Sequence, residues 1–260
     1  MHGRLCVFCF LLITLVACRK VEQKDVLIIG HAASGLANVS VPFQDNTLEA
    51  INYAFSHSKC NGVELDLQLS ADNQLILFHN TELSQNTNKE GCVRDYNRVD
   101  LITTQYKTLN KEKIAALDQV NFLNNKTYFL DIRHLNSCTQ EIINVNRYIS
   151  ALSSIALPEK LFFTVSSQAY IEPFKQAGYA VLYVADSEQD AVNAIDTYNF
   201  DGVELRLNNI SATFVESYKK NDFLVGIYDV RAAKSIQKAI LMQPSFLSTD
   251  DIKRTINCLK

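Results

Sequence analysis

Short apolar segments alternate with segments of helical spacing along most of this chain. Residues 26–30 are continuously apolar, which is typical of a strand buried on both faces. Comparable apolar segments occur at 128–133, 161–165, 180–184, 202–205, 223–228 and 245–248. Apolar residues recur with helical spacing at 48–55, 141–152, 168–177, 187–198, 211–220, 231–242 and from about 250 onward. Strands that alternate with helices predict an α/β fold with a parallel sheet.

The segment 61–80 has a different pattern. Glu64 and Asp66 alternate with apolar residues, so their side chains share one face of a strand. Residues 71–74 are rich in turn formers, and a chain reversal there predicts a hairpin that brings His79 roughly opposite Asp66. The segment on its own also fits an edge hairpin whose charges simply face water.

Counting the first arm of this hairpin as the second strand gives eight strand–helix units. Eight units with short connections predict a single (β/α)8 barrel over residues 26–260, with a β-hairpin excursion and an insertion after the second strand. The insertion, residues 81–126, is mostly polar and shows a helical pattern at about 111–120.

Several polar side chains follow the predicted strands at the same end. His31 ends the first strand, Glu64 and Asp66 lie toward the end of the second, and Asp131 and Arg133 share one face of the third. In barrels of this type the functional side chains gather where the strands end. Because a solvated hairpin does not predict this convergence, the pattern favours a functional site.

The predicted cluster has a defined chemistry. Its three carboxylates, Glu64, Asp66 and Asp131, suit a hard divalent cation such as Mg²⁺ or Ca²⁺. His31 and His79 beside such a cation are suited to act as general base and general acid. Arg133 is placed to hold a phosphate oxygen.

The start of the chain predicts export and membrane attachment. Residues 1–17 comprise a short basic head and an apolar run too short to span a bilayer, and they end in a small residue before Cys18. This order resembles a bacterial lipoprotein signal, in which the cysteine is lipidated. We therefore expect a signal peptide at 1–17, an anchor and linker at 18–25, and a lipid-anchored protein in the bacterial cell envelope.

Charge and length limit the partners. The whole chain has a net charge of -3, and removing the signal peptide with its single charged residue, Arg4, leaves 24 basic and 28 acidic residues, or -4. A nucleic-acid partner is therefore not expected. We expect a monomer that acts on a small molecule.

Four cysteines follow Cys18, namely Cys60, Cys92, Cys138 and Cys258. An exported compartment permits disulfides, and the sequence leaves three pairings as well as four free thiols open. Their spacing does not resemble a zinc site.

Taken together, these residues resemble the glycerophosphodiester phosphodiesterase family. The signature of that family runs His-Arg-Gly, Glu-Asn-Thr, Glu-x-Asp, His-Asp, Glu-Ile-Lys and Thr-Asp. The matching residues here are His31-Ala32-Ala33, Asp45-Asn46-Thr47, Glu64-Leu65-Asp66, His79-Asn80, Asp131-Ile132-Arg133 and Thr249-Asp250. The similarity extends in order over nearly all of residues 26–250.

The resemblance implies roles for the matched residues. Glu64, Asp66 and Asp131 correspond to the metal ligands, and His31 and His79 to the acid–base pair. Arg133 takes the place of a phosphate-binding lysine. The implied reaction is hydrolysis of a phosphodiester to an alcohol and glycerol 3-phosphate.

The chain departs from the family pattern at the arginine after the first histidine, where it has Ala32. One charge-assisted phosphate contact, of about 1.5 to 3 kcal/mol, is therefore missing unless another residue replaces it. Arg231, which follows the seventh strand, is a candidate replacement. Asp131 is shorter than the glutamate that the family has at this position. An aspartate here also resembles the pattern of the sphingomyelinase D-like phospholipases.

Other residues near strand ends have two interpretations each. Glu204 and Arg206 either line the mouth of the barrel, the end at which the strands finish, or form an ordinary ion pair. Tyr228 either forms a wall for a glycerol moiety or packs in the core. His57 and His134 are expected to be surface or loop residues.

Two further functions stay open at this point. Ala32 and Ala33 are compatible with a non-catalytic barrel that binds a phosphodiester without turnover. A phospholipase of the sphingomyelinase D or phosphoinositide type, acting on intact lipid, would agree with the predicted anchor.

Overall fold

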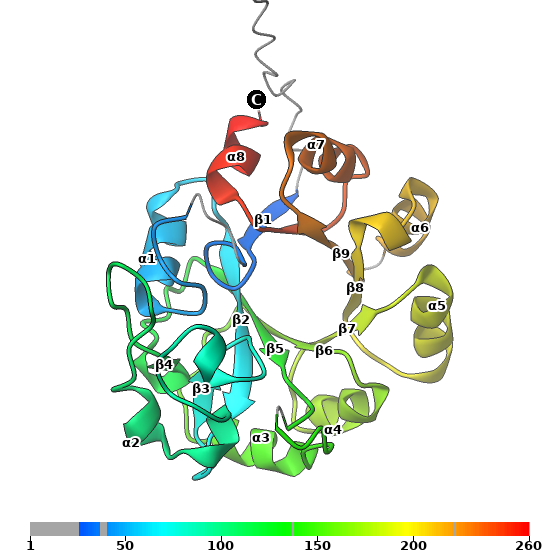
Figure 1. Ribbon diagram of the computed structural model, residues 1–260. Coiled ribbons are helices and arrows are strands. Elements are labelled where there is room, and N and C mark those ends of the chain that lie inside the picture. The colour runs from blue at the N-terminus through cyan, green and yellow to red at the C-terminus, as the bar shows by residue number, and fades with distance from the viewer. Residues whose placement is uncertain (1–25, 37–40, 137, 221, 260) are drawn as a thin grey trace, which may run out of the picture.

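The computed structural model describes residues 26–36, 41–136, 138–220 and 222–259. In this part of the chain eight parallel strands close into a barrel, because β1 pairs with both β10 and β2 (Figure 1). The barrel strands are β1 (Leu27–Gly30), β2 (Gly62–Leu69), β5 (Thr127–Ile132), β6 (Leu161–Val165), β7 (Val181–Ala185), β8 (Gly202–Arg206), β9 (Leu224–Val230) and β10 (Phe246–Thr249). The predicted (β/α)8 barrel with an excursion is confirmed.

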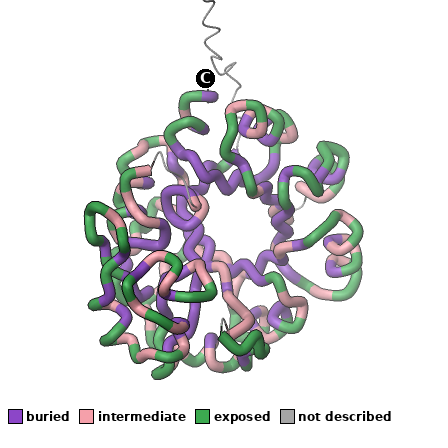
Figure 2. The backbone as a smooth tube through the Cα atoms, in the orientation of Figure 1, coloured by how far each residue is buried: buried purple, intermediate pink, exposed green. Residues whose placement is uncertain are grey.

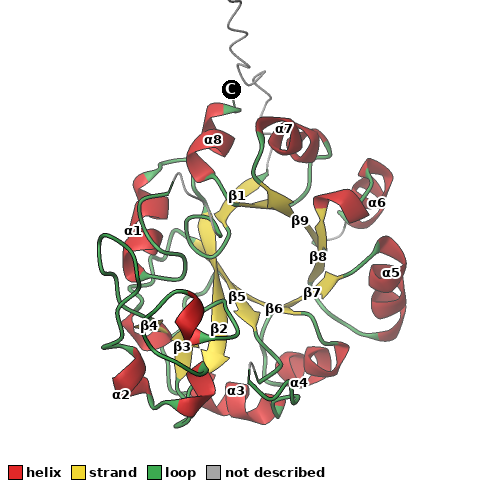
Figure 3. Cartoon of the chain, viewed as in Figure 1, coloured by secondary structure: helices red, strands yellow, loops and turns green. Residues whose placement is uncertain are grey.

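Helices surround the barrel on its outer side (Figure 3). They are α1 (Leu48–Ser56), α3 (Val145–Leu152), α4 (Ile171–Gln176), α5 (Glu188–Thr197), α6 (Ala212–Tyr218), α7 (Ala233–Leu241) and α8 (Ile252–Asn257). Short 3-10 turns precede α4 and α6, at η4 (Gln168–Tyr170) and η5 (Leu207–Asn209). Side chains of Thr47, Ser187 and Ser211 accept hydrogen bonds from free backbone N–H groups at helix starts, which fixes where these helices begin.

The excursion after β2 forms a subdomain with its own apolar cluster. It contains β3 (Leu75–Leu77), β4 (Ala115–Ala116), α2 (Arg98–Leu101) and the 3-10 turns η1 (Leu83–Gln85), η2 (Val93–Asp95) and η3 (Leu117–Gln119). β3 pairs antiparallel with both β2 and β4. The cluster beneath it comprises Ile76, Phe78, Leu83, Val93, Leu101, Tyr106, Ile114 and Ala116.

The helix predicted at 111–120 is wrong. Ile114 and Ala116 pack in the excursion cluster, whereas Ala115 and Leu117 pack in the main core. This alternation has a period of two, which is that of a strand between two apolar layers. The helix predicted from 141 begins instead at Val145, since Ile142 bridges to Leu135 in a short antiparallel pairing.

Aromatic and aliphatic side chains fill one end of the barrel interior. Ile29, Phe129, Leu182 and Phe246 form this layer, and buried residues follow the barrel wall (Figure 2). Phe129 and Asp131 lie two residues apart on one strand and therefore share a face. The apolar layer thus lies beneath the carboxylates and leaves polar side chains at the ends of the strands.

The predicted signal peptide, linker and lipidated Cys18 lie outside the described residues. Among the residues that are described, no helix combines the length and apolar character needed to cross a membrane.

Candidate functional site

A cavity of about 270 Å³ lies where the barrel strands end. Its walls include the six residues that the sequence places together, namely His31, Glu64, Asp66, His79, Asp131 and Arg133. Arg231 is not among its lining residues.

Three carboxylates form the floor of the cavity. Glu64, Asp66 and Asp131 each offer an oxygen, and these oxygens lie within 4.8 Å of one another. Burial, together with the charge of Asp66, raises the pKa of Glu64 well above its usual range. Crowded carboxylates of this kind are stabilised by a proton or a cation, and an all-oxygen donor set fits a hard divalent ion. The residues present therefore fit the metal that the sequence predicts.

Arg133 lies against this cluster. Its guanidinium donates a hydrogen bond to Asp66, and its Nε lies 3.2 Å from Oδ2 of Asp131. Although burial by itself would lower the pKa of Arg133, Asp66 and Asp131 raise it, so the guanidinium stays charged. Arg133 offsets part of the negative charge and still has N–H groups in the cavity wall.

His31 is held by a residue from the opposite end of the chain. Its Nδ1 lies 2.8 Å from Oδ1 of Asp250, and its Nε2 lies 3.8 Å from Oε2 of Glu64. Burial alone would lower the pKa of His31, but Asp250 and Glu64 raise it to about 10. The Asp250 contact therefore directs Nε2 of the imidazole toward the carboxylates and favours its protonated form.

Arg231 pairs with Asp250. Its guanidinium donates to Oδ2 of Asp250 at 3.0 and 3.3 Å. Asp250 also accepts from the backbone N–H of Leu36 at 3.1 Å. A series of polar contacts therefore runs from Arg231 through Asp250 to His31, which lines the cavity. The predicted phosphate contact of Arg231 is not tested by this arrangement and stays a prediction.

His79 enters the cavity from the hairpin. The backbone N–H of Phe78 donates to the carbonyl of Asp66, so Phe78 lies opposite Asp66 and His79 comes one residue later. The half-buried imidazole lies 3.1 Å through Nδ1 from the side-chain oxygen of Asn80. The hairpin thereby brings a second imidazole to the cavity that His31 and the carboxylates line.

Asn46 fixes Asp66, a contact that the sequence alone did not reveal. The Asn46 amide donates to Oδ2 of Asp66 at 2.7 Å, and its oxygen accepts from the Asp66 backbone N–H at 2.9 Å. Asn46 has a positive φ of 56°, which asparagine tolerates better than most residues. The Asp-Asn-Thr motif was the available signal for this residue.

The turn after His31 supplies a backbone donor. Ala32 and Ala33 have positive φ values of 47° and 76°, and the N–H of Ala32 donates to Oε2 of Glu64 at 2.7 Å. Ala32 is fully buried and does not line the cavity. The charge that the family pattern has at this position is absent, and Arg133 and Arg206 are the arginines in the described part of the cavity wall.

Glu204, Arg206 and Tyr228 all line the cavity. Glu204 and Arg206 do not pair with each other: Arg206 lies 3.5 Å from Asp229 and over the ring of Tyr228. Burial raises the pKa of Glu204 to about 7. Of the two interpretations from the sequence, lining the mouth or forming an ion pair with Arg206, the structure agrees with the first for Glu204.

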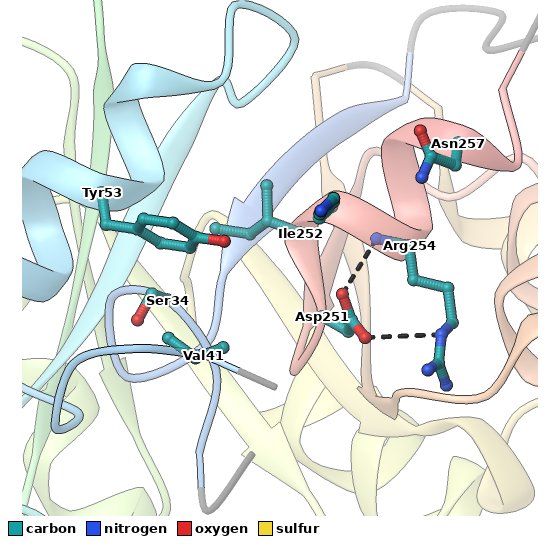
Figure 4. A pocket seen from close by; sticks show the side chains of 8 residues that line it. Ser34, Val41, Tyr53, Asp251, Ile252, Arg254 and Asn257 are labelled. Atoms are coloured by element: carbon teal, nitrogen blue, oxygen red, sulfur yellow. Dashed lines mark hydrogen bonds and ion pairs between the residues drawn. The ribbon is translucent and has the colours of Figure 1, made fainter. Parts of the chain in front are cut away.

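A second cavity, also of about 270 Å³, lies beside α8 and contains none of the predicted site residues (Figure 4). Ser34 and Tyr53 face Asp251 and Arg254 across it, and Asp251 accepts from the backbone N–H of Arg254 at 2.9 Å. Its described lining residues include no cluster of histidines or carboxylates, so the barrel mouth is the better candidate for chemistry.

The excursion is linked covalently to the mouth. Cys92, beside η2, forms a disulfide with Cys138 in the β5–α3 connection. Cys60 is buried with a free thiol. His134 lies near Ser166 in a smaller cavity of about 170 Å³ that adjoins the main one and shares His79 and Arg133 with it.

The fold and the cavity define a class of protein: a (β/α)8 barrel with a polar cavity at the ends of its strands, lined by two histidines, three clustered carboxylates and arginine side chains. Comparison with known proteins then gives the family. The model of the "Glycerophosphoryl diester phosphodiesterase family" matches residues 32–254. The chain belongs to this family, as its motifs suggested.

Individual relatives agree with the family. A glycerophosphodiester phosphodiesterase from Bacillus altitudinis is 39% identical over 83 residues, which cover 30% of this chain and 34% of that protein. The matched segment therefore spans about one third of the relative.

Solved structures share the fold. The glycerophosphodiester phosphodiesterase from Thermotoga maritima superposes with a TM-score of 0.71 at 20% identity, covering 89% of this chain and 97% of the other. A phosphodiesterase from Oleispira antarctica, in complex with the product sn-glycerol-3-phosphate, gives a TM-score of 0.69 at 15% identity, with coverage of 89% and 96%.

Proposed function

We propose that this protein is a metal-dependent phosphodiesterase that hydrolyses glycerophosphodiesters to an alcohol and glycerol 3-phosphate. The observation that carries the proposal is the convergence of two histidines, three carboxylates and Arg133 on one cavity of about 270 Å³. Family membership supports the same activity, and a structural neighbour binds sn-glycerol-3-phosphate.

The carboxylates of Glu64, Asp66 and Asp131 would hold the cation, either Mg²⁺ or Ca²⁺. A divalent ion bound there would withdraw charge from a phosphate oxygen. Arg133 would hold another phosphate oxygen through the N–H groups not engaged by Asp66 and Asp131. Arg231 is a second candidate for phosphate binding, although its described contacts lead to Asp250.

His31 and His79 would move the protons. His79 takes a proton from the attacking water, whose oxygen bonds to phosphorus, and the bond from phosphorus to the leaving alcohol breaks. His31, kept protonated by Asp250, gives its Nε2 proton to the oxygen of that alcohol. The fixed orientation of the imidazole means that little reorganisation accompanies proton transfer.

The test uses purified protein with glycerophosphocholine and glycerophosphoethanolamine, assayed for glycerol 3-phosphate with Mg²⁺, Ca²⁺ or EDTA. We expect metal-dependent release that falls about 10²- to 10⁴-fold in His31→Ala and in His79→Ala. His57→Ala is a matched control, since His57 contacts Tyr53 on α1 and does not line the cavity.

Other outcomes select the rival functions. Release of a head group from phospholipid vesicles, without release from soluble glycerophosphodiesters, would favour a phospholipase that acts on intact lipid. Binding of glycerophosphocholine without turnover under any metal would favour a non-catalytic barrel.

We also propose that residues 1–17 are a lipoprotein signal and that Cys18 carries the lipid, which would place the barrel in the cell envelope. The order of a basic head, an apolar run and Ala17-Cys18 supports this. In a bacterial host the protein should partition into detergent, and Cys18→Ser should move it to the aqueous phase. Recovery of the wild-type protein in the aqueous phase would contradict the proposal.

A further inference from the structure

Glu204 is a buried carboxyl group that no described residue satisfies by a hydrogen bond. Its residue is 5% exposed, and it makes no hydrogen bond or ion pair with any described residue. Its register neighbours on the two adjacent strands are Val184 and Gly226, which offer no polar side chain. Burying a carboxyl group without a partner is costly, so such a group usually serves a ligand.

The carboxyl group faces the proposed active site. Val203 and Leu205 pack in the main core outside the barrel, and alternation along β8 therefore turns Glu204 inward. Glu204 lines the same cavity as His31 and Arg133. It does not belong to the carboxylate cluster of Glu64, Asp66 and Asp131. The cavity thus holds the groups proposed for phosphate binding and proton transfer and, outside that set, the carboxyl group of Glu204, which has no hydrogen-bond partner among the described residues.

The chemistry of this wall favours hydroxyl groups. A carboxyl group has two oxygens and binds hydroxyls in either protonation state, as acceptor when ionised and as donor and acceptor when protonated. A cationic head group would also attract a carboxylate. However, Arg206 lies two residues further along the same face of β8 and lines the cavity too, so it would repel a cation.

We propose that Glu204 binds the hydroxyl groups of the glycerol moiety and makes the enzyme specific for phosphodiesters that carry a polyol next to the phosphate. This inference rests on the proposed function. It assigns the carboxyl group of Glu204 to the substrate rather than to the metal or to Arg206.

The kinetic test compares glycerophosphocholine with propyl phosphocholine, which has the same carbon chain without the two hydroxyls. Choline release gives kcat/KM for both. Wild type should prefer the glycerol substrate by at least about 10²-fold, because a site that pairs with a hydroxyl rejects the analogue lacking it. Glu204→Leu should reduce this preference at least tenfold, because kcat/KM falls for the glycerol substrate and stays the same for propyl phosphocholine. The preference of Glu204→Gln should lie between those of wild type and Glu204→Leu.

Glu216→Gln is the matched control, since Glu216 is exposed on α6. It should leave the preference unchanged. Equal losses on both substrates in the Glu204 variants would overturn the inference, because they would indicate a role in chemistry or in folding. An unchanged preference would overturn it as well.

A binding measurement separates this inference from the proposed reaction. Calorimetry of wild type with sn-glycerol 3-phosphate and with propyl phosphate needs no turnover. Tighter binding of the glycerol compound, lost in Glu204→Leu, supports the inference even if no diester is hydrolysed. Equal affinity of wild type for both ligands overturns it even if the hydrolase activity is present.

Discussion

Asp250→Asn tests how the barrel orients its acid. Asp250 is 1% exposed and accepts from His31, Leu36 and Arg231. Asparagine has nearly the same shape, but it loses the negative charge and replaces one acceptor oxygen with a donor. That amide cannot satisfy both the imidazole N–H and the guanidinium, so one of the two contacts with His31 and Arg231 is lost.

The size of the effect follows from the His31 contact. A hydrogen bond between charged groups contributes about 1.5 to 3 kcal/mol, which corresponds to about 10- to 150-fold in rate if it acts fully in the transition state. Asp250 is also the largest of the groups that raise the pKa of His31 to about 10, ahead of Glu64. Its neutralisation should lower that pKa, so that His31 loses its proton at a lower pH.

The assay is the pH dependence of kcat/KM for glycerophosphocholine hydrolysis. In Asp250→Asn we expect a loss of about 10- to 150-fold and an alkaline limb that moves to lower pH. Asp196→Asn, on the exposed face of α5, is the control and should change neither. A folded Asp250→Asn variant with wild-type rate and an unmoved alkaline limb would refute the argument that Asp250 sets the charge and orientation of His31.

Three further predictions concern the metal, the buried acid and the disulfide. Asp131→Asn removes one of three clustered carboxylates, so calorimetry should show Mg²⁺ or Ca²⁺ binding at least about tenfold weaker; equal affinity would place the ion elsewhere. The pKa of Glu204 rises from 4.5 to about 7 on folding, so between these pH values the native state holds a proton that the unfolded state has lost. The free energy of unfolding should therefore decrease by on the order of 3 kcal/mol as the pH rises from 4.5 to about 7. Urea unfolding of Glu204→Gln at pH 5 and pH 8 should show a smaller decrease, and identical decreases would contradict the burial argument. The Cys92–Cys138 disulfide joins residues separated by 46 positions, so the variant with serine at both positions should lose about 2 to 4 kcal/mol; unchanged unfolding would mean that the excursion is held by packing alone.

The sequence predicted most of the residues that line the candidate site because their signals are local. Alternation within β2 placed Glu64 and Asp66 on one face, and the end of each apolar run marked where a side chain enters the mouth. The structure then brings these residues together with His79, Asp131 and Arg133 around one cavity. The period of two in residues 114–117 was misinterpreted, because the two alanines at its centre also favour a helix.

Contacts between distant residues could not be read in this way. Asp250 lies 219 residues from His31 and reaches it because β1 pairs in parallel with β10, with Gly30 opposite Thr249. The same closure directs Arg231 toward Asp250. Asn46 reaches Asp66 through a turn with positive φ, and Cys92 meets Cys138 because the excursion folds back over the β5–α3 connection.

The sequence by itself therefore determined the barrel, the candidate metal ligands and the two histidines, since strand periodicity and the shared end of parallel strands fix which side chains enter the mouth. Only the tertiary structure decided what each of those side chains contacts. It gave His31 a carboxylate partner, paired Arg231 with Asp250 and left Glu204 without a hydrogen-bond partner among the described residues. These outcomes depend on strand register and barrel closure, which join residues whose separation along the chain carries no local signal.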